Sequence, residues 1–368
     1  MELPDKKLKS YINIFITITF MLTCIGFLFI YSSSSVFALE KFGSATYFLK
    51  KQLIYFIPSL LGFFLFSTIP IAWWKRRAPI LFLGSLILTA LTLISSLGLK
   101  VHGSNRWLYI GGIGGQPSEL LKLFLFMYIG FFLERKQHRI RSFWQSYLPF
   151  WAILGISFAV LLKQPDFGSV MTILTTSLML FFVAQFRTIY LLYTLALAIP
   201  AIVWLVLSKA YRINRILIFL NPWSDPQGRG FQIIQSLIAI GSGNFWGLGI
   251  SNSRQKFFYL PMQHTDFIFS IIAEETGFIG ALVIISLYLL FCLYGFRLVL
   301  QVKDLFAFFT ALGFVIFISL QAAINLMVTT GLLPTKGLSL PFISYGGTAM
   351  ISLFCMVGFI VNAGTNSK

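Results

Sequence analysis

Charged residues are scarce in this 368-residue chain, and acidic residues are the scarcest of them. Only 11% of the residues are charged, against roughly 25% in a soluble domain, while 57% are hydrophobic. Twenty-eight basic residues outnumber 11 acidic ones and give a net charge of +17. The composition excludes a soluble globular protein and favours a polytopic membrane protein. Its positive charge then reflects topology and contact with phosphate-bearing membrane lipids, and not nucleic acid.

Cysteine and histidine are also scarce, with three residues of each. The cysteines all fall inside apolar runs, so we expect small core residues and no disulfide framework. The histidines are too scattered for a metal site. The positions concerned are Cys24, Cys292, Cys355, His102, His138 and His264.

Long apolar runs dominate the chain, and a run of about 20 apolar residues is long enough to span a membrane. The first run is longer than the apolar region of a cleavable signal peptide, so it predicts a transmembrane helix. We expect one all-α membrane domain over residues 1–368 with ten spans and both termini on one side. The predicted spans are 11–37, 47–70, 78–98, 117–134, 146–163, 167–186, 188–207, 267–297, 304–328 and 345–363.

Basic residues cluster in the connections on the side of the termini. Because short cytoplasmic connections are enriched in Lys and Arg, both termini are predicted to be cytoplasmic. A large extracytoplasmic loop, at about 208–266, then separates the seventh and eighth spans. Within it, 231–240 predicts a short helix lying on or dipping into the outer interface. The orienting residues are Lys6, Lys7, Lys9, Lys75, Arg76, Arg77, Arg135, Lys136, Arg139, Arg141, Arg187, Arg297 and Lys303.

Asp266 is the most informative acidic residue, because it lies where the polar stretch 259–266 meets a long hydrophobic run. A carboxylate at membrane depth is costly and therefore indicates function. We interpret Asp266, with His264 beside it, as a group that does chemistry at a membrane surface. Basic residues of the same face would hold an anionic lipid substrate.

Other polar residues at the predicted helix ends leave two interpretations open. Glu119 and Lys122 are spaced i,i+3, so they form either a structural ion pair or part of a substrate site. Arg106 either binds phosphate or extends to the lipid head groups. Asp166 either caps the next helix or lines the same site as Asp266.

Two further segments carry buried charge or irregular backbone. At least one residue of the Glu274–Glu275 pair is expected to contact a basic residue. The segment 331–347 has two prolines and four glycines, which predicts an irregular loop on the outer face. Such backbone is tolerated at membrane depth where it lines a cavity, so we expect Lys336 to point into one.

These residues resemble the SEDS family (shape, elongation, division, sporulation), whose members polymerise peptidoglycan glycan strands. The resemblance covers nearly the whole chain. Runs 252–256 and 333–340 are more similar to the cell-division member than to the elongation member. One departure is Met262, where the family usually has Glu. The motifs that carry the resemblance are 103–107, 116–122, 164–168, 230–243, 264–269 and 333–347.

The resemblance implies a SEDS fold and a glycosyltransferase that polymerises lipid II. An α-linked donor and a β-1,4 product require inversion in a single displacement, so one base is sufficient. Asp266 matches the essential aspartate of the family and is assigned as that base. No cofactor is required, although Mg²⁺ or Mn²⁺ is compatible with the chemistry. The candidate substrate-binding residues are Lys336, Arg254, Lys256, Arg215, Arg106, Glu119, Lys122, Asp166, His264 and Ser344.

The resemblance also implies a partner and a location. The partner is a class B penicillin-binding protein, a monofunctional transpeptidase, together with other membrane proteins of the division machinery. The location is the bacterial cytoplasmic membrane, with the active site on the extracytoplasmic face. Three alternatives remain open at this point: an elongation polymerase, a lipid II flippase or transporter, and a non-catalytic division scaffold.

Overall fold

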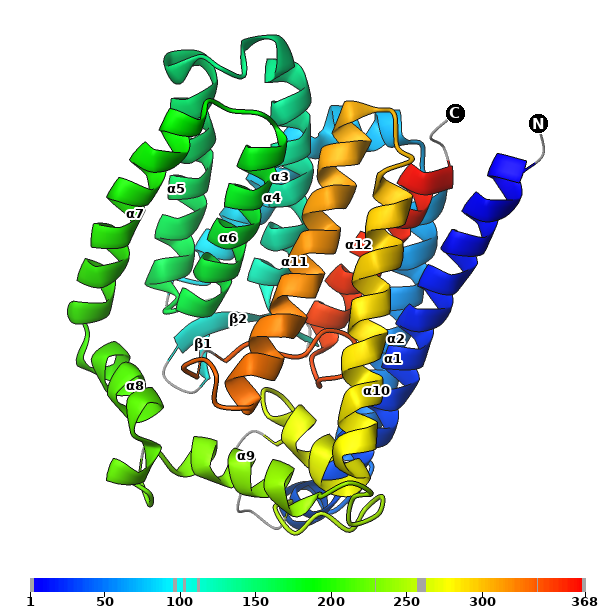
Figure 1. The fold of residues 1–368 in the computed structure, drawn as a ribbon, viewed down its shortest axis with the longest axis vertical. Coiled ribbons are helices and arrows are strands. Elements are labelled where there is room, and N and C mark those ends of the chain that lie inside the picture. Colours follow the sequence, from blue (N-terminus) through cyan, green and yellow to red (C-terminus); the bar gives the residue numbers. More distant parts are fainter. Residues whose placement is uncertain are drawn as a thin grey trace.

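The structure is a computed structural model that describes residues 3–94, 98–101, 104–110, 113–228, 230–256, 263–335 and 337–365. It is mainly a bundle of long helices (Figure 1). The helices are α1 (Leu3–Phe42), α2 (Tyr47–Thr68), α3 (Ile71–Leu91), α4 (Pro117–Lys136), α5 (Leu148–Lys163), α6 (Phe167–Val183), α7 (Thr188–Leu207), α8 (Ala210–Leu220), α9 (Phe231–Ser242), α10 (Ile268–Val299), α11 (Leu305–Thr329) and α12 (Gly347–Thr365).

Each of the ten predicted spans overlaps one long helix, namely α1 to α7 and α10 to α12. Among the described residues, seven helices are long and apolar enough to cross a membrane. One of these seven, Phe143–Lys163, combines α5 with the π-helical turn Phe143–Tyr147 before it. The chain is therefore a mainly helical protein with several candidate membrane spans, and a total of ten spans stays a prediction.

A small antiparallel sheet, which was not predicted, accompanies the helices that make up most of the structure. Its strands are β1 (Gly98–Val101), β2 (Ser104–Ile110) and β3 (Ile113–Gly115), in the order β1-β2-β3. In the sequence, glycine-containing pairs separate these short segments, as is common in tight hairpins. The sheet lies between α3 and α4 in the chain, and its central strand positions Arg106.

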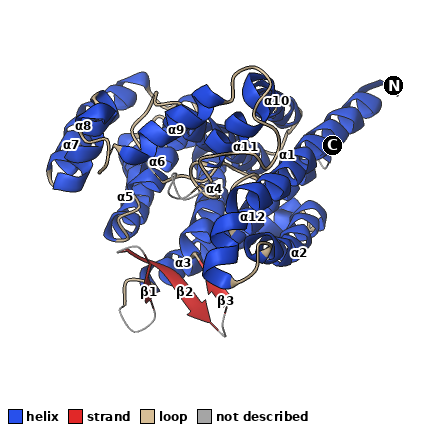
Figure 2. Ribbon diagram, turned by 90° about the horizontal axis from the view of Figure 1, so that it is seen from below, coloured by secondary structure: helices blue, strands red, loops and turns tan. Residues whose placement is uncertain are grey.

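The two ends of the bundle differ. Both termini lie at one end, whereas the sheet, α8 and α9 lie at the other (Figure 1). Figure 2, viewed from the second end, shows the sheet at one edge and α8 and α9 on the opposite side, with loops between them. The termini thus share one end, as an even number of spans predicts.

Helices α11 and α12 form the centre of the bundle, and α7 lies at its periphery. Of the residues in the most apolar part of α12, 83% are buried, against 12% in α7. Small residues allow α12 to approach α2 closely: a Cβ at Gly358 would lie 2.4 Å from the carbonyl oxygen of Phe63. Cys355 is buried at this contact, as predicted, whereas Cys24 is exposed on α1, contrary to prediction.

Helix α9 confirms the predicted helix at 231–240. Its Ile233, Ile234 and Ala239 are buried. The hydroxyl of Ser236 lies 2.6 Å from that of Ser270 and donates to the carbonyl of Thr329 at 2.7 Å. One face of the helix therefore packs against α10 and α11, whereas Leu237 and Ile238 stay exposed.

Candidate active site

Asp266 lies in the turn Gln263–Phe267, directly ahead of α10, and is half-buried. Hydrogen bonds fix the backbone at Asp266 and at the two residues before it. The carbonyl of Asp266 accepts a hydrogen bond from Asn325 Nδ2 at 2.8 Å, and that of Thr265 accepts from the Ser344 hydroxyl at 2.6 Å. The N–H of Tyr345 donates to the His264 carbonyl at 3.0 Å. Asp266 is thus presented by α11 and by the irregular segment before α12.

Three amide side chains hold that irregular segment in place. None of them was predicted from the sequence. Gln321 donates to the Ser339 carbonyl at 2.9 Å, and Asn325 donates to the Leu338 carbonyl at 2.6 Å. Gln52 of α2 accepts from the N–H of Gly346 at 3.2 Å. Since an extended loop has no helical hydrogen bonds, such side chains satisfy its backbone. The sequence feature that could have identified these three residues is an amide side chain inside an apolar run.

Gly337 brings the same segment against the carboxylate. It has a φ of +66°, which favours glycine, and a Cβ placed there would lie 3.4 Å from Asp266 Oδ2. On the other side of position 336, the Thr335 carbonyl accepts from Arg215 Nη1 at 3.2 Å. Lys336, one of the candidate substrate-binding residues, lies outside the described residues, although both its neighbours lie at the site.

Burial and the charges of two arginines and one further acid determine the pKa of Asp266. Burial raises the pKa of Asp266 from 3.8 to about 6, because a desolvated carboxyl group favours its neutral form. The charges of Arg106 and Arg215 lower this pKa, and the negative charge of Asp166 raises it. The structure therefore brings together four predicted site residues from β2, α8, the start of α6 and the start of α10.

Arg106 is held by the turn that precedes α6. Its Nε donates to the Gln164 carbonyl at 2.9 Å, and its Nη2 donates to the Pro165 carbonyl at 2.7 Å. The next residue, Asp166, caps α6 by accepting from the N–H of Ser169 at 3.2 Å and from its hydroxyl at 2.8 Å. Asp166 thus caps α6, which is one of the two interpretations left open by the sequence. Its negative charge also raises the pKa of Asp266.

His264, unlike Asp266, belongs to a cluster of aromatic rings. Its ring packs among aromatic rings, with centroids 4.4 Å from Phe48 and 5.9 Å from Phe37 and from Tyr345. Burial lowers the pKa of His264 to about 4, so the imidazole is neutral at physiological pH. A neutral ring in an aromatic cluster positions the turn and contributes no positive charge towards a phosphate.

Lys256 and Arg254 lie apart from this group of charges. Lys256 is buried, and its Nζ lies 4.0 Å from Glu275 Oε1, which confirms that one acid of the pair contacts a basic residue. Glu274 accepts from the N–H of Arg254 at 2.9 Å, while the Arg254 side chain is exposed. Glu275 also accepts from the hydroxyl of Ser32 on α1 at 2.6 Å. These acids therefore anchor the loop before Asp266.

The loop is anchored where α10 is interrupted. Gly277 has a φ of +68° within that helix, and the N–H of Phe278 donates to the Asn244 carbonyl at 2.8 Å. The N–H groups of Leu248 and Gly249 donate to the carbonyls of Glu274 and Glu275, both at 3.0 Å. The loop thus satisfies backbone groups that the interrupted helix leaves unpaired.

The remaining candidates have protein partners. Lys122 is buried and pairs with Glu119 at 2.6 Å, so of the two open interpretations the structure shows the ion pair. The Ser344 hydroxyl donates to Thr265 and accepts from the N–H of Leu340 at 2.8 Å, so it positions the Asp266 turn. Among the described residues, no group of three or more His, Cys, Asp or Glu side chains is arranged to hold a metal ion.

The arrangement defines a class of protein: a helical membrane protein with one half-buried carboxylate, flanked by arginines, at one end of its bundle. The family model "Cell cycle protein" (FtsW, RodA and SpoVE) matches residues 12–368. The chain belongs to this FtsW/RodA/SpoVE family.

Named relatives agree with that assignment. The chain is 41% identical to "Probable peptidoglycan glycosyltransferase FtsW" of Geobacter sp. (strain M18), covering 99% of both chains. It is 38% identical to "Stage V sporulation protein E" of Bacillus subtilis (strain 168), covering 96% of both.

Solved structures show the same fold. One belongs to a peptidoglycan synthase complex that coordinates polymerization and crosslinking, with a TM-score of 0.78, 31% identity and coverage of 96% of this chain and 97% of that chain. Another is the rod shape determining protein RodA of Thermus thermophilus, with a TM-score of 0.70, 26% identity and 96% coverage of both chains.

Proposed function

We propose that this protein is a peptidoglycan glycosyltransferase of the cell-division type, which polymerises lipid II on the extracytoplasmic face of the bacterial cytoplasmic membrane. The observation that carries the proposal is the half-buried carboxylate of Asp266 among the charges of Arg106 and Arg215. The FtsW name of the relatives supports the division role. The clustering of short basic connections at the end with the termini supports ten spans and cytoplasmic termini.

Asp266 acts as the general base in this proposal. It accepts the proton of the acceptor 4-hydroxyl as that oxygen forms the new bond to the donor C1. The bond from C1 to the pyrophosphate oxygen breaks, and undecaprenyl pyrophosphate leaves with the electron pair. Arg106 and Arg215 stabilise the negative charge that accumulates on the leaving group. The proposal needs no further cofactor for this role, and it is also compatible with a divalent cation such as Mg²⁺ or Mn²⁺ at the leaving group.

The similar solved structure from a peptidoglycan synthase complex supports a particular kind of partner. Its complex couples polymerization to crosslinking, so the proposed partner is a crosslinking enzyme, namely a class B penicillin-binding protein. Other division proteins of the membrane are expected around this pair.

The first test is polymerisation of labelled lipid II by the purified protein together with its cognate transpeptidase. Long glycan strands from wild type are expected, and their absence from Asp266→Ala that still binds the partner. Normal strands from that variant would refute the role of Asp266. If wild type makes no strands but moves lipid II across a vesicle membrane, the protein is a flippase.

The rate of polymerisation is expected to fall on acidification through about pH 6. The pKa of Asp266 is raised to about 6, so the carboxylate is ionised above that pH and cannot accept a proton below it. The rate should drop about tenfold per pH unit on the acid side. Arg215→Gln removes a charge that lowers this pKa, so it should move the acid limb to higher pH. An identical profile in that variant would show that another group titrates.

A further inference from the structure

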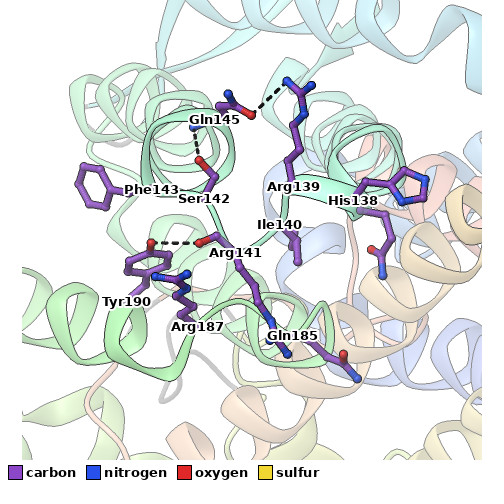
Figure 3. Close-up of a pocket in the computed structure, with 11 residues that line it drawn as sticks. His138, Arg139, Ile140, Arg141, Ser142, Phe143, Gln145, Gln185, Arg187 and Tyr190 are labelled. Atoms are coloured by element: carbon purple, nitrogen blue, oxygen red, sulfur yellow. Dashed lines mark hydrogen bonds between the residues drawn. The ribbon is translucent and has the colours of Figure 1, made fainter.

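A basic recess lies at the end of the molecule that carries the termini, opposite Asp266. It forms where the α4–α5 connection meets the start of α7 and has a volume of about 780 Å³. Its lining includes Arg139 and Arg141 from the first connection, Arg187 from the second, and His138 (Figure 3). None of the described residues that line it is a carboxylate, and arginines that lack such a neighbour in a recess favour an anion.

The backbone of this recess is fixed by side chains. The Ser146 hydroxyl donates to the carbonyl of Arg139 at 2.8 Å, and the Tyr190 hydroxyl donates to that of Arg141 at 3.1 Å. Arg139 Nη1 also donates to Gln145 Oε1 at 3.2 Å. The connection is therefore a built surface, in which the positions of the arginine backbones are set before any ligand arrives.

A second recess, of about 710 Å³, adjoins the first and shares Arg141, Gln185 and Arg187 with it. Apart from these residues its lining is mainly the apolar end of α6. Phe182 is 72% exposed and Val183 is 40% exposed, both at the end of α6. Arg141 and Arg187 thus separate a polar recess from an apolar surface that would face membrane lipid.

We propose that the two recesses together bind an anionic phospholipid. Its phosphate lies between Arg141 and Arg187, and an acyl chain lies along Phe182 and Val183. Guanidinium groups donate two parallel hydrogen bonds to a phosphate, and basic recesses between helices at the cytoplasmic side suit anionic head groups. A soluble phosphate would use the polar recess but would leave the apolar one without a function.

The lipid site is separate from the proposed catalytic site. It lies at the other end of the bundle, and none of its lining residues acts on the pKa of Asp266. Its test therefore does not depend on whether the protein polymerises lipid II.

The test is native mass spectrometry of the purified full-length protein exchanged into phosphatidylglycerol or phosphatidylethanolamine. Wild type is expected to retain phosphatidylglycerol preferentially. Arg141→Gln/Arg187→Gln should reduce that retention about tenfold or more, because basic residues near an anionic surface dominate such binding. Retention of phosphatidylethanolamine should not change. Thermal melting of each variant shows whether it is folded.

Two controls decide between the lipid and simpler explanations. Lys6→Gln/Arg76→Gln removes the same charge from exposed positions at the same end and should retain lipid as wild type does. An equal loss in that control would show nonspecific attraction and overturn the proposal. Phe182→Ala should weaken phosphatidylglycerol about threefold but leave inorganic phosphate unaffected. Tight binding of inorganic phosphate with no effect of Phe182→Ala would show a free-phosphate site instead.

Discussion

Asp266→Asn is expected to abolish lipid II polymerisation while leaving the folded protein at least as stable as wild type. The amide keeps the size of the side chain but cannot accept the acceptor hydroxyl proton. A general base contributes about 10²- to 10⁴-fold to a rate, so a loss of that size is expected. The measurement is the initial rate of strand formation with the transpeptidase partner present.

The stability part of this prediction follows from the pKa of Asp266. Its folded pKa of about 6 lies above its ordinary value of 3.8, so the folded state favours the neutral form between these values. Ionisation at pH 7 therefore costs stability, and a neutral amide removes that cost. Loss of activity with an unchanged or higher melting temperature would separate chemistry from misfolding.

The matched control is Glu40→Gln, which neutralises an exposed carboxylate near the end of α1, at the same end of the molecule. It is expected to polymerise at the wild-type rate. If Asp266→Asn also stays within about threefold of wild type, Asp266 is a structural residue and the base lies elsewhere.

The sequence predicted the helices because lipid imposes a simple requirement. A run of about 20 apolar residues satisfies its own backbone only as a helix, so each predicted span overlaps a helix. The sheet was missed because its strands are short, and the hydropathy pattern that identifies spans carries no signal for them. The interruption of α10 at Gly277 was missed for a similar reason, since its hydropathy is continuous there.

The candidate site was predictable one residue at a time but not as an arrangement. Asp266 was identified as a carboxylate at membrane depth, and Arg106 as a cation that binds phosphate or extends to the head groups. Their common location depends on β2 meeting the turn before α6, a tertiary contact between distant parts of the chain. Basic residues also look alike in a sequence, so Lys256, buried beside Glu275, was grouped with Arg215.

The buried contact between Lys256 and Glu275 leads to the second large expected effect. Glu275→Leu is expected to lower the free energy of unfolding by roughly 3–5 kcal/mol, because it leaves a buried ammonium group without its carboxylate. It also removes the acceptor of the Ser32 hydroxyl. Denaturation of the purified protein in detergent measures the loss.

Two comparison variants test whether the buried pair of Lys256 and Glu275 accounts for the loss of stability. Glu134→Leu removes the partner of Lys75 from a partly exposed pair, so it should cost less than about 1 kcal/mol. Adding Lys256→Met to Glu275→Leu should recover part of the lost stability, because it removes the buried positive charge that Glu275 no longer balances. Equal losses in Glu275→Leu and Glu134→Leu would contradict the role of the buried pair. If Lys256→Met gives no recovery, the hydrogen bond from Ser32 anchors the loop to α1, and the charge of Lys256 does not.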